Sequence, residues 1–239
     1  MVKMFLEDNK SFYQYDLRAR DIISSFADKY FYPNLLRNHE VVIRSKDKAK
    51  HVKGVDLTIH NWWNRKSTRV CEKTSSHYIN SELSNFAFEI GTGRNLGWFI
   101  REENETDVYS IIWVRADRAR YPMTRYANNY FISFQEMDIE YMLACLIRKE
   151  ALFSYLASAG LARQDLLDKA NEMAAKKQER DNSYRGKYGF WFVYSKDLYE
   201  SPVNLIIGKD VLSKLSVIDG VAHCYRFSTE KMERLDRLP

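Results

Sequence analysis

Polar and apolar residues alternate with the period of a β-strand through much of the first half of the chain. Alternation predicts a strand because successive side chains of a strand point to opposite faces of its sheet. Several short runs of this kind follow one another between residues 54 and 115, separated by polar turns, and they predict a β-meander. The expected strands are 54–60, 69–74, 85–91, 96–101 and 108–114.

Apolar residues with helical spacing stand on both sides of this meander. Residues 11–31 repeat apolar side chains every three or four positions, and Pro33 ends the helix that they predict. Ser133 and Glu136 have the spacing of a capping box, which predicts a second helix to about residue 158. The meander therefore lies between two expected helices.

The remainder of the chain mixes both periods. We expect a helix over about 163–178, strands at 188–194 and 203–207, a short helix at 210–215 and a last strand at 223–227. The order of helix, meander, helices and strands predicts an α+β fold with a mixed central β-sheet flanked by helices. A length of 239 residues, with few glycines and prolines, fits one elaborated domain. Its core would span about 11–158, with a C-terminal α/β elaboration over 159–239.

The spacing of the cysteines and the absence of long apolar runs indicate the cellular compartment. The three cysteines, Cys71, Cys145 and Cys224, are far apart and form no CxxC pair, which excludes a zinc knuckle or a disulfide framework. The N-terminus turns acidic after six residues, so no signal-peptide core develops. No run approaches the roughly 18 apolar residues of a membrane span. We expect a cytoplasmic protein with no membrane partner.

Three carboxylates lie inside expected strands among apolar or β-branched neighbours: Asp56, Glu72 and Glu89. A carboxylate is costly to keep next to a core unless it is paired, hydrogen-bonded or bound to a metal. One interpretation is that each is an ion-pair partner on a half-exposed sheet. The other is that these acids, together with Lys73, form a divalent-metal site for phosphodiester hydrolysis.

Two basic segments are candidates for contacting a phosphate backbone. The first, 37–53, leads directly into Asp56, and the second, 118–129, interleaves arginines with tyrosines. Solvated surface loops are the alternative interpretation, and a net charge of +5 permits a polyanionic partner without requiring one. The candidate nucleic-acid-binding residues are Lys46, Lys48, Lys50, Lys53, His77, Arg118, Arg120 and Arg125.

The order of these features resembles the PD-(D/E)XK, or restriction-endonuclease-like, superfamily of nucleases. The resemblance covers about 12–158 and rests on an opening helix, Asp56 on a strand, a hairpin, the acid–lysine pair Glu72–Lys73, a further strand and a helix. It implies a restriction-endonuclease-like core and a nuclease that hydrolyses DNA with Mg²⁺, or with Mn²⁺ in its place. Asp56 matches the first metal-binding acid of the family, and Lys73 matches the lysine that positions the attacking water.

The residues that would carry this chemistry are Asp56, Glu72, Lys73 and Glu89, with Asp56, Glu72 and Glu89 as metal ligands. The sequence departs from the family pattern two residues before Lys73, where Cys71 replaces an acid. Strand alternation places Lys73 on the face of Cys71 and turns Glu72 to the other face. Three alternatives follow. A β-bulge turns Glu72 to the face of Lys73, or Glu89 supplies the missing carboxylate ligand, or the metal site is degenerate.

Two functions from different classes therefore stay open. One is a Mg²⁺-dependent endo- or exodeoxyribonuclease; the other is a catalytically degenerate nuclease-fold protein that binds nucleic acid or a protein partner. A structural accessory protein without any nucleic acid is a third. The sequence leaves the DNA structure recognised and the formation of a homo-oligomer open.

Overall fold

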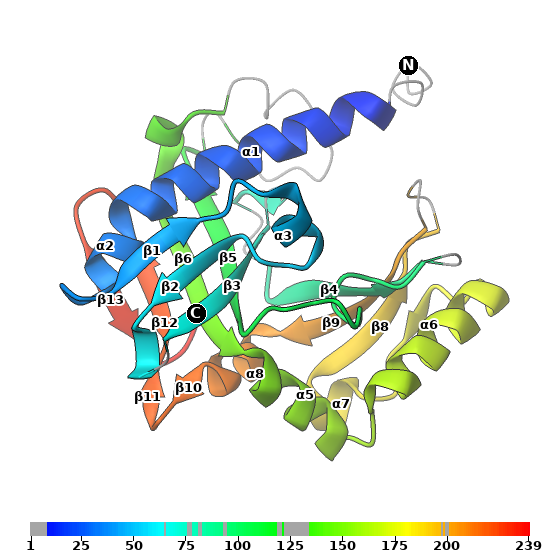
Figure 1. Cartoon of the computed structure of the whole chain (residues 1–239). Helices are drawn as coiled ribbons and strands as arrows, with labels where there is room; N and C mark the ends of the chain where they lie inside the picture. The colour runs from blue at the N-terminus through cyan, green and yellow to red at the C-terminus, as the bar shows by residue number, and fades with distance from the viewer. Residues whose placement is uncertain are drawn as a thin grey trace.

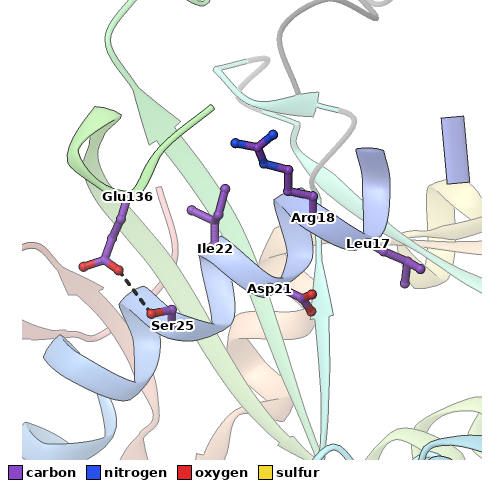
Figure 2. Close-up of a pocket in the computed structure, with 6 residues that line it drawn as sticks. All are labelled: Leu17, Arg18, Asp21, Ile22, Ser25 and Glu136. Atoms are coloured by element: carbon purple, nitrogen blue, oxygen red, sulfur yellow. Dashed lines mark hydrogen bonds between the residues drawn. The ribbon is translucent and has the colours of Figure 1, made fainter. Parts of the chain in front are cut away.

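The computed structural model describes residues 9–64, 66–75, 78–80, 83–92, 95–118, 121, 134–196, 198 and 201–239 of the chain. The fold is mixed α+β, with a curled mixed sheet flanked by helices, as the sequence predicts (Figure 1). No helix in the described part of the chain is long and apolar enough to cross a membrane.

A seven-stranded sheet forms the centre of the molecule (Figure 1). Its order is β1 (Val41–Arg44), β2 (Leu57–His60), β3 (Ser67–Thr74), β5 (Val108–Ala116), β6 (Ile139–Arg148), β12 (Cys224–Phe227) and β13 (Met232–Leu235). The neighbours β3 and β5 are parallel, and the other neighbours are antiparallel. A parallel pair needs a crossover connection. The chain between β3 and β5 provides it and carries β4 into a second sheet, so the expected β-meander over 54–115 is wrong.

Helix α1 (Asn9–Tyr30) crosses one face of this sheet, followed by the short helix α2 (Tyr32–Leu35) (Figure 1). The inward side of α1 is apolar because Ile23 and Phe26 recur at helical spacing, and both are fully buried. They pack in one cluster with strand residues such as Leu57, Val70 and Phe227. This cluster fixes the helix against the sheet.

A second layer covers the opposite face. It contains a four-stranded antiparallel sheet in the order β4 (Asn85–Gly91), β9 (Val203–Gly208), β8 (Phe190–Tyr194) and β7 (Arg180–Asp181). The helices are α5 (Lys149–Ser158), α6 (Arg163–Lys176), α7 (Arg185–Tyr188) and α8 (Lys209–Leu215). The core between the layers is rich in aromatic rings, among them Phe88, Phe99 and Tyr109.

Smaller elements occupy the connections. They are α3 (Lys48–Val52), the 3₁₀ turns η2 (Trp62–Asn64) and η4 (Glu136–Asp138), and the two-stranded ribbon of β10 (Val217–Ile218) and β11 (Val221–Ala222). α3 precedes β2, whereas η2 connects β2 to β3.

Most expected elements are confirmed, including α1, α6, α8, β8, β9 and β12, but the expected helix ending near residue 158 is wrong over its first half. Residues Ile139–Arg148 form β6, and only Lys149–Ser158 are helical. β6 pairs with β5 on one side and β12 on the other, and most of its residues are buried. A central strand that is apolar on both faces contains a helical pattern by coincidence, and strand pairing overrides the helical propensity of Leu, Met and Ala.

The expected strand at 96–101 is also wrong. Residues 98–100 form a turn, and Leu96 makes an isolated bridge with Gly91. The chain folds back here against the backbone of β4, with the amide of Gly97 donating to the carbonyl of Ile90 at 3.1 Å. The absence of a side chain at Gly97 permits this approach, because a Cβ atom would collide with the Glu89 carbonyl group.

This close approach predicts that Gly97→Ala destabilises the protein by about 1–3 kcal/mol, the usual cost of overpacking. The matched control is Gly186→Ala in α7, where an added Cβ meets no atom within 4 Å. The free energy of unfolding in urea measures both. Equal stability of the two variants would contradict the close packing at Gly97.

Candidate functional site

Asp56 is held at the start of β2 by a compact turn. α3 is capped at its N-terminus by Asp47, whose Oδ1 accepts a hydrogen bond from the Ala49 amide at 2.8 Å. Gly54 then adopts a φ of +77°, a left-handed conformation that favours glycine, and its amide donates to the His51 carbonyl at 3.0 Å. The chain leaves this turn directly into Asp56.

Both carboxylate oxygens of Asp56 have partners. Oδ2 accepts a hydrogen bond from the Glu72 amide at 2.8 Å, and Oδ1 lies 2.9 Å from Nδ1 of His51. The other ring nitrogen of His51 lies 3.1 Å from the carbonyl oxygen of Ser45. The Asp56 side chain is 14% exposed, so it lies at the edge of the interior.

Cys71 and Lys73 lie on the same face of the sheet as Asp56. The register of β2 with β3 pairs Leu57 with Val70, which places Asp56 opposite Cys71. The charges of Lys73 and Asp56 both act on the Cys71 thiol, with a smaller effect than its burial. Burial raises the pKa of Cys71 to about 12, so the thiol is uncharged at neutral pH.

Lys73 is further positioned by an aromatic ring. Its Nζ lies 4.1 Å from the ring centroid of Trp98, a cation–π distance, and the side chain is half-buried. Asp56, Cys71 and Lys73 therefore lie on one face of two adjacent strands.

Glu72 points to the opposite face, as strand alternation predicts. Its carboxylate accepts hydrogen bonds from Ser24 Oγ at 2.9 Å, from the Tyr32 hydroxyl at 2.7 Å and from Arg44 Nη1 at 2.7 Å. Glu72 is 4% exposed. These three donors come from α1, α2 and β1, so Glu72 ties those elements to β3.

The charges of this network reinforce one another. Arg44 also contacts Asp28 through two hydrogen bonds of 2.6 and 2.7 Å. Burial alone would lower the pKa of Arg44, but its bonds to Asp28 and Glu72 raise it above the ordinary value. Burial, with the adjacent Glu72 charge, likewise raises the pKa of Tyr32. Arg44 is therefore the fixed counter-charge of Glu72.

Glu89 lies in the second sheet, on β4, which pairs with β9. Its neighbours Phe88 and Ile90 are fully buried in the core between the sheets. The Glu89 side chain points away from that core because side chains alternate along a strand. The structure therefore does not bring Glu89 beside Asp56.

The basic candidates are only partly described. Lys46, Lys50 and Lys53 are exposed around α3, and Lys53 pairs with Glu105 at 2.8 Å. Arg118 is exposed just beyond β5. The candidates that lie outside the described residues are the Lys48 side chain, His77, Arg120 and Arg125.

Sequence patterns did not identify the residues that bond to the two acids. His51 contacts Asp56, and Ser24 and Tyr32 donate to Glu72, but none of the three belongs to a local sequence motif. Arg44 stood in a basic segment, and the signal of its orientation is strand alternation in β1. Alternation turns Arg44 away from the face of Val41 and Ile43, which the structure shows to be exposed.

The donor set does not fit Mg²⁺ as it stands. Mg²⁺ takes hard oxygen ligands in near-octahedral geometry. On the face of Lys73, Asp56 supplies a carboxylate, while Cys71 opposite it supplies a neutral thiol. Among the residues that the structure describes, no three His, Cys, Asp or Glu side chains are grouped to hold a metal ion. The predicted ligands Asp56, Glu72 and Glu89 are thus not assembled.

The fold defines this chain as an α+β protein of two packed sheets with a polar cluster at Asp56. No protein-family model matches the sequence, and no curated protein and no solved structure is detectably similar to it. The restriction-endonuclease-like core stays a prediction.

The buried network predicts that Arg44→Met leaves the carboxylates of Glu72 and Asp28 without their cation. Removing one partner of a buried ion pair costs about 3–5 kcal/mol. We expect a marked fall in the melting temperature, measured by circular dichroism.

The control is Lys29→Met, which breaks the surface pair of Lys29 with Glu136 at 2.8 Å. Exposed pairs contribute little, so this variant should melt close to the parent protein. Equal melting of both variants would show that Glu72 does not depend on Arg44.

Proposed function

We propose that this chain is a DNA-binding protein with a nuclease-like arrangement of Asp56 and Lys73 and a degenerate metal site. The observation that carries the proposal is the position of Cys71. Cys71 lies opposite Asp56 on the neighbouring strand and shares its face of β3 with Lys73, where the resembled family has its second acid. Glu72, the nearest acid in sequence, is engaged by Arg44 on the other face.

Loss of the second acid removes the electrostatic basis of metal-assisted hydrolysis. Two or three carboxylates usually offset the charge of a divalent ion beside a substrate phosphate. A single carboxylate, already bonded to His51 and to the Glu72 amide, offers one charge. The Lys73 side chain can still donate to a phosphate oxygen. The arrangement therefore favours binding over cleavage.

The cations near α3 support a polyanionic partner. Lys46, Lys50 and Lys53 are exposed on the segment that carries His51, the partner of Asp56. A phosphate backbone bound there would release counterions, which makes binding depend on salt. A protein partner at the same surface is the alternative. The proposal places the protein in the cytoplasm, where its three free thiols would stay reduced.

A retained Mg²⁺- or Mn²⁺-dependent nuclease is the second candidate function. The observation that favours it is the convergence of Asp56 and Lys73 on one face of adjacent strands. In that case the wild-type protein cleaves DNA with Mn²⁺, and Asp56→Asn abolishes cleavage.

Restoring the acid tests the degenerate site directly. Cys71→Asp places a second carboxylate between Asp56 and Lys73. We expect Mn²⁺ binding by calorimetry and nicking of supercoiled plasmid to appear in this variant, and to disappear when Asp56→Asn is added. Cys71→Asn is the control, because it has nearly the same shape without the charge.

A thermal melt of each variant checks that the acid is tolerated at this buried position, since closely set acids repel one another without a metal. Metal-dependent cleavage of DNA by the wild-type protein would contradict the degenerate metal site and support the retained nuclease. A folded Cys71→Asp protein that binds no Mn²⁺ would refute the nuclease-like arrangement.

The basic segment gives a second test. Replacing Lys46, Lys48 and Lys50 together by Glu should weaken DNA binding and make its dependence on salt shallower by about 0.9 logarithmic units per lost phosphate contact. Fluorescence anisotropy with a labelled duplex at several salt concentrations measures both.

The control carries the same change in charge at exposed lysines elsewhere: Lys176, Lys214 and Lys231, each to Glu. An unchanged salt slope in the first variant, or equal losses in both, would place DNA away from α3.

A further inference from the structure

A second cluster of cationic and aromatic side chains lies on the other side of the central sheet. It contains Trp63 from η2, Arg148 at the end of β6, His223 just before β12 and Arg234 on β13. Figure 1 shows the connection between β2 and β3 near β11 and β12. The ring of Trp63 joins two of these elements, since its centroid lies 5.2 Å from that of His223 and 5.3 Å from the guanidinium carbon of Arg148. The register of β13 with β12 places Arg234 opposite Tyr225, two residues from His223.

Strand alternation separates this cluster from Asp56 and Lys73. The side chain of Tyr225 packs in the core under α1 and α2, where its ring centroid lies 5.4 Å from that of Phe31. His223 is two residues before Tyr225 and therefore lies on the same face of the sheet. Arg148 is two residues after Leu146, which belongs to the same core. The cluster therefore shares the α1 face of the sheet, whereas Cys71 belongs to the core on the other face.

The backbone of Trp63 is held in an unfavourable conformation. Its φ of 50° and ψ of 43° are left-handed, which is rare for a bulky side chain. The ring stacks on Trp62 at 3.7 Å with an interplanar angle of 18°, and the guanidinium carbon of Arg148 lies 5.3 Å from its centroid. Strained residues of this kind persist where the surrounding structure fixes them, and they concentrate at functional sites. The stack fixes Arg148 in place.

The guanidinium group of Arg148 is poorly satisfied. Its Nε is buried without a hydrogen-bond partner in the described part of the chain. The carboxylate beside it, that of Asp219, lies 3.8 Å away, beyond hydrogen-bonding distance, and the Asp219 side chain is 82% exposed. Asp219 therefore does not hydrogen-bond the Arg148 guanidinium group, whose planar array of donors suits an anion.

The surroundings of His223 carry an excess of positive charge. Burial and the charges of Arg234 and Arg148 lower the pKa of His223 to about 4, against a smaller opposing effect of Asp219. The Tyr225 hydroxyl lies 3.2 Å from Nδ1 of His223. When that hydroxyl donates, the neutral imidazole carries its proton on Nε2 and is itself a donor. The imidazole then adds a donor to those of the two arginines, whose charges both act on it.

We propose that Arg148, His223 and Arg234 form a binding site for a phosphate group. Planar guanidinium groups match the oxygens of phosphate, and charge-assisted hydrogen bonds to phosphate are short and strong. The ligand is a free phosphate ion or a phosphate carried by a nucleic acid. The site lies on the face opposite Asp56, so it does not depend on the function proposed for Asp56 and Lys73.

The proposal predicts coupling between phosphate and the proton of His223. An anion favours the charged imidazolium, so bound phosphate should raise the pKa of His223 from about 4 toward its ordinary value. Phosphate should accordingly bind more tightly as the pH falls through that range. The charged and titratable groups facing His223 are Arg148 from β6, Arg234 from β13, Asp219 from the turn between β10 and β11, and Tyr225 from β12.

The experiment is an NMR titration of the histidine rings of the full chain with inorganic phosphate, with His223 assigned from His223→Gln. Arg234→Gln removes an exposed cation and should keep the fold. We expect it to weaken phosphate binding about tenfold or more, as loss of a charge-assisted bond does. Arg237→Gln, an exposed arginine on the same C-terminal segment, is the matched control and should bind as the parent does.

A 5′-phosphorylated oligonucleotide and its 5′-hydroxyl counterpart distinguish the sources. Tighter binding of the phosphorylated strand than of either the hydroxyl strand or free phosphate identifies a nucleic-acid end. Equal binding of both strands identifies a backbone phosphate, and response to inorganic phosphate alone identifies the free ion. The proposal is overturned when none of the three changes the His223 resonance at millimolar concentration, or when Arg234→Gln and Arg237→Gln have the same effect.

Discussion

The ion pair between Glu72 and Arg44 is the interaction on which the rest of the structure depends. A buried carboxylate is unfavourable unless it is fully bonded. Glu72 meets that requirement with donors from α1, α2 and β1, which are separate from β3 in the sequence. The same carboxylate therefore determines where the first helix and the edge strand lie against the sheet. The backbone amide of Glu72, in turn, donates a hydrogen bond to the Asp56 carboxylate.

Strand alternation then divides the chemistry of β3 between two faces. Because Glu72 is committed to the side of α1, its neighbours Cys71 and Lys73 must face the second sheet, where they meet Asp56. A carboxylate on that face would lie beside Asp56, whereas the thiol that is present adds no charge. The bonded carboxylate of Glu72 on one face and the uncharged thiol of Cys71 on the other thus both follow from the alternation of three consecutive residues.

The two faces also differ in how far their charges are balanced. On the face of Asp56, one carboxylate and one lysine are near balance, with His51 and Trp98 as additional partners. At the far end of the α1 face, Arg148 and Arg234 exceed the single loosely placed Asp219. An anion is the natural complement of such an excess. The proposed phosphate site lies at this excess of positive charge, on the face opposite Asp56 and Lys73.

The sequence by itself determined what depends on local periodicity. The strands at Asp56 and Lys73, the opposite orientation of Glu72 and the helix α1 all follow from spacings of two or about 3.6 residues. Local periodicity failed at β6, where apolar residues on both faces satisfy either period, and only pairing with β5 and β12 selects the strand. Tertiary structure alone decided that Arg44 meets Glu72 and that Trp63 meets His223, because strand register brings together residues whose sequence neighbours carry no trace of the contact.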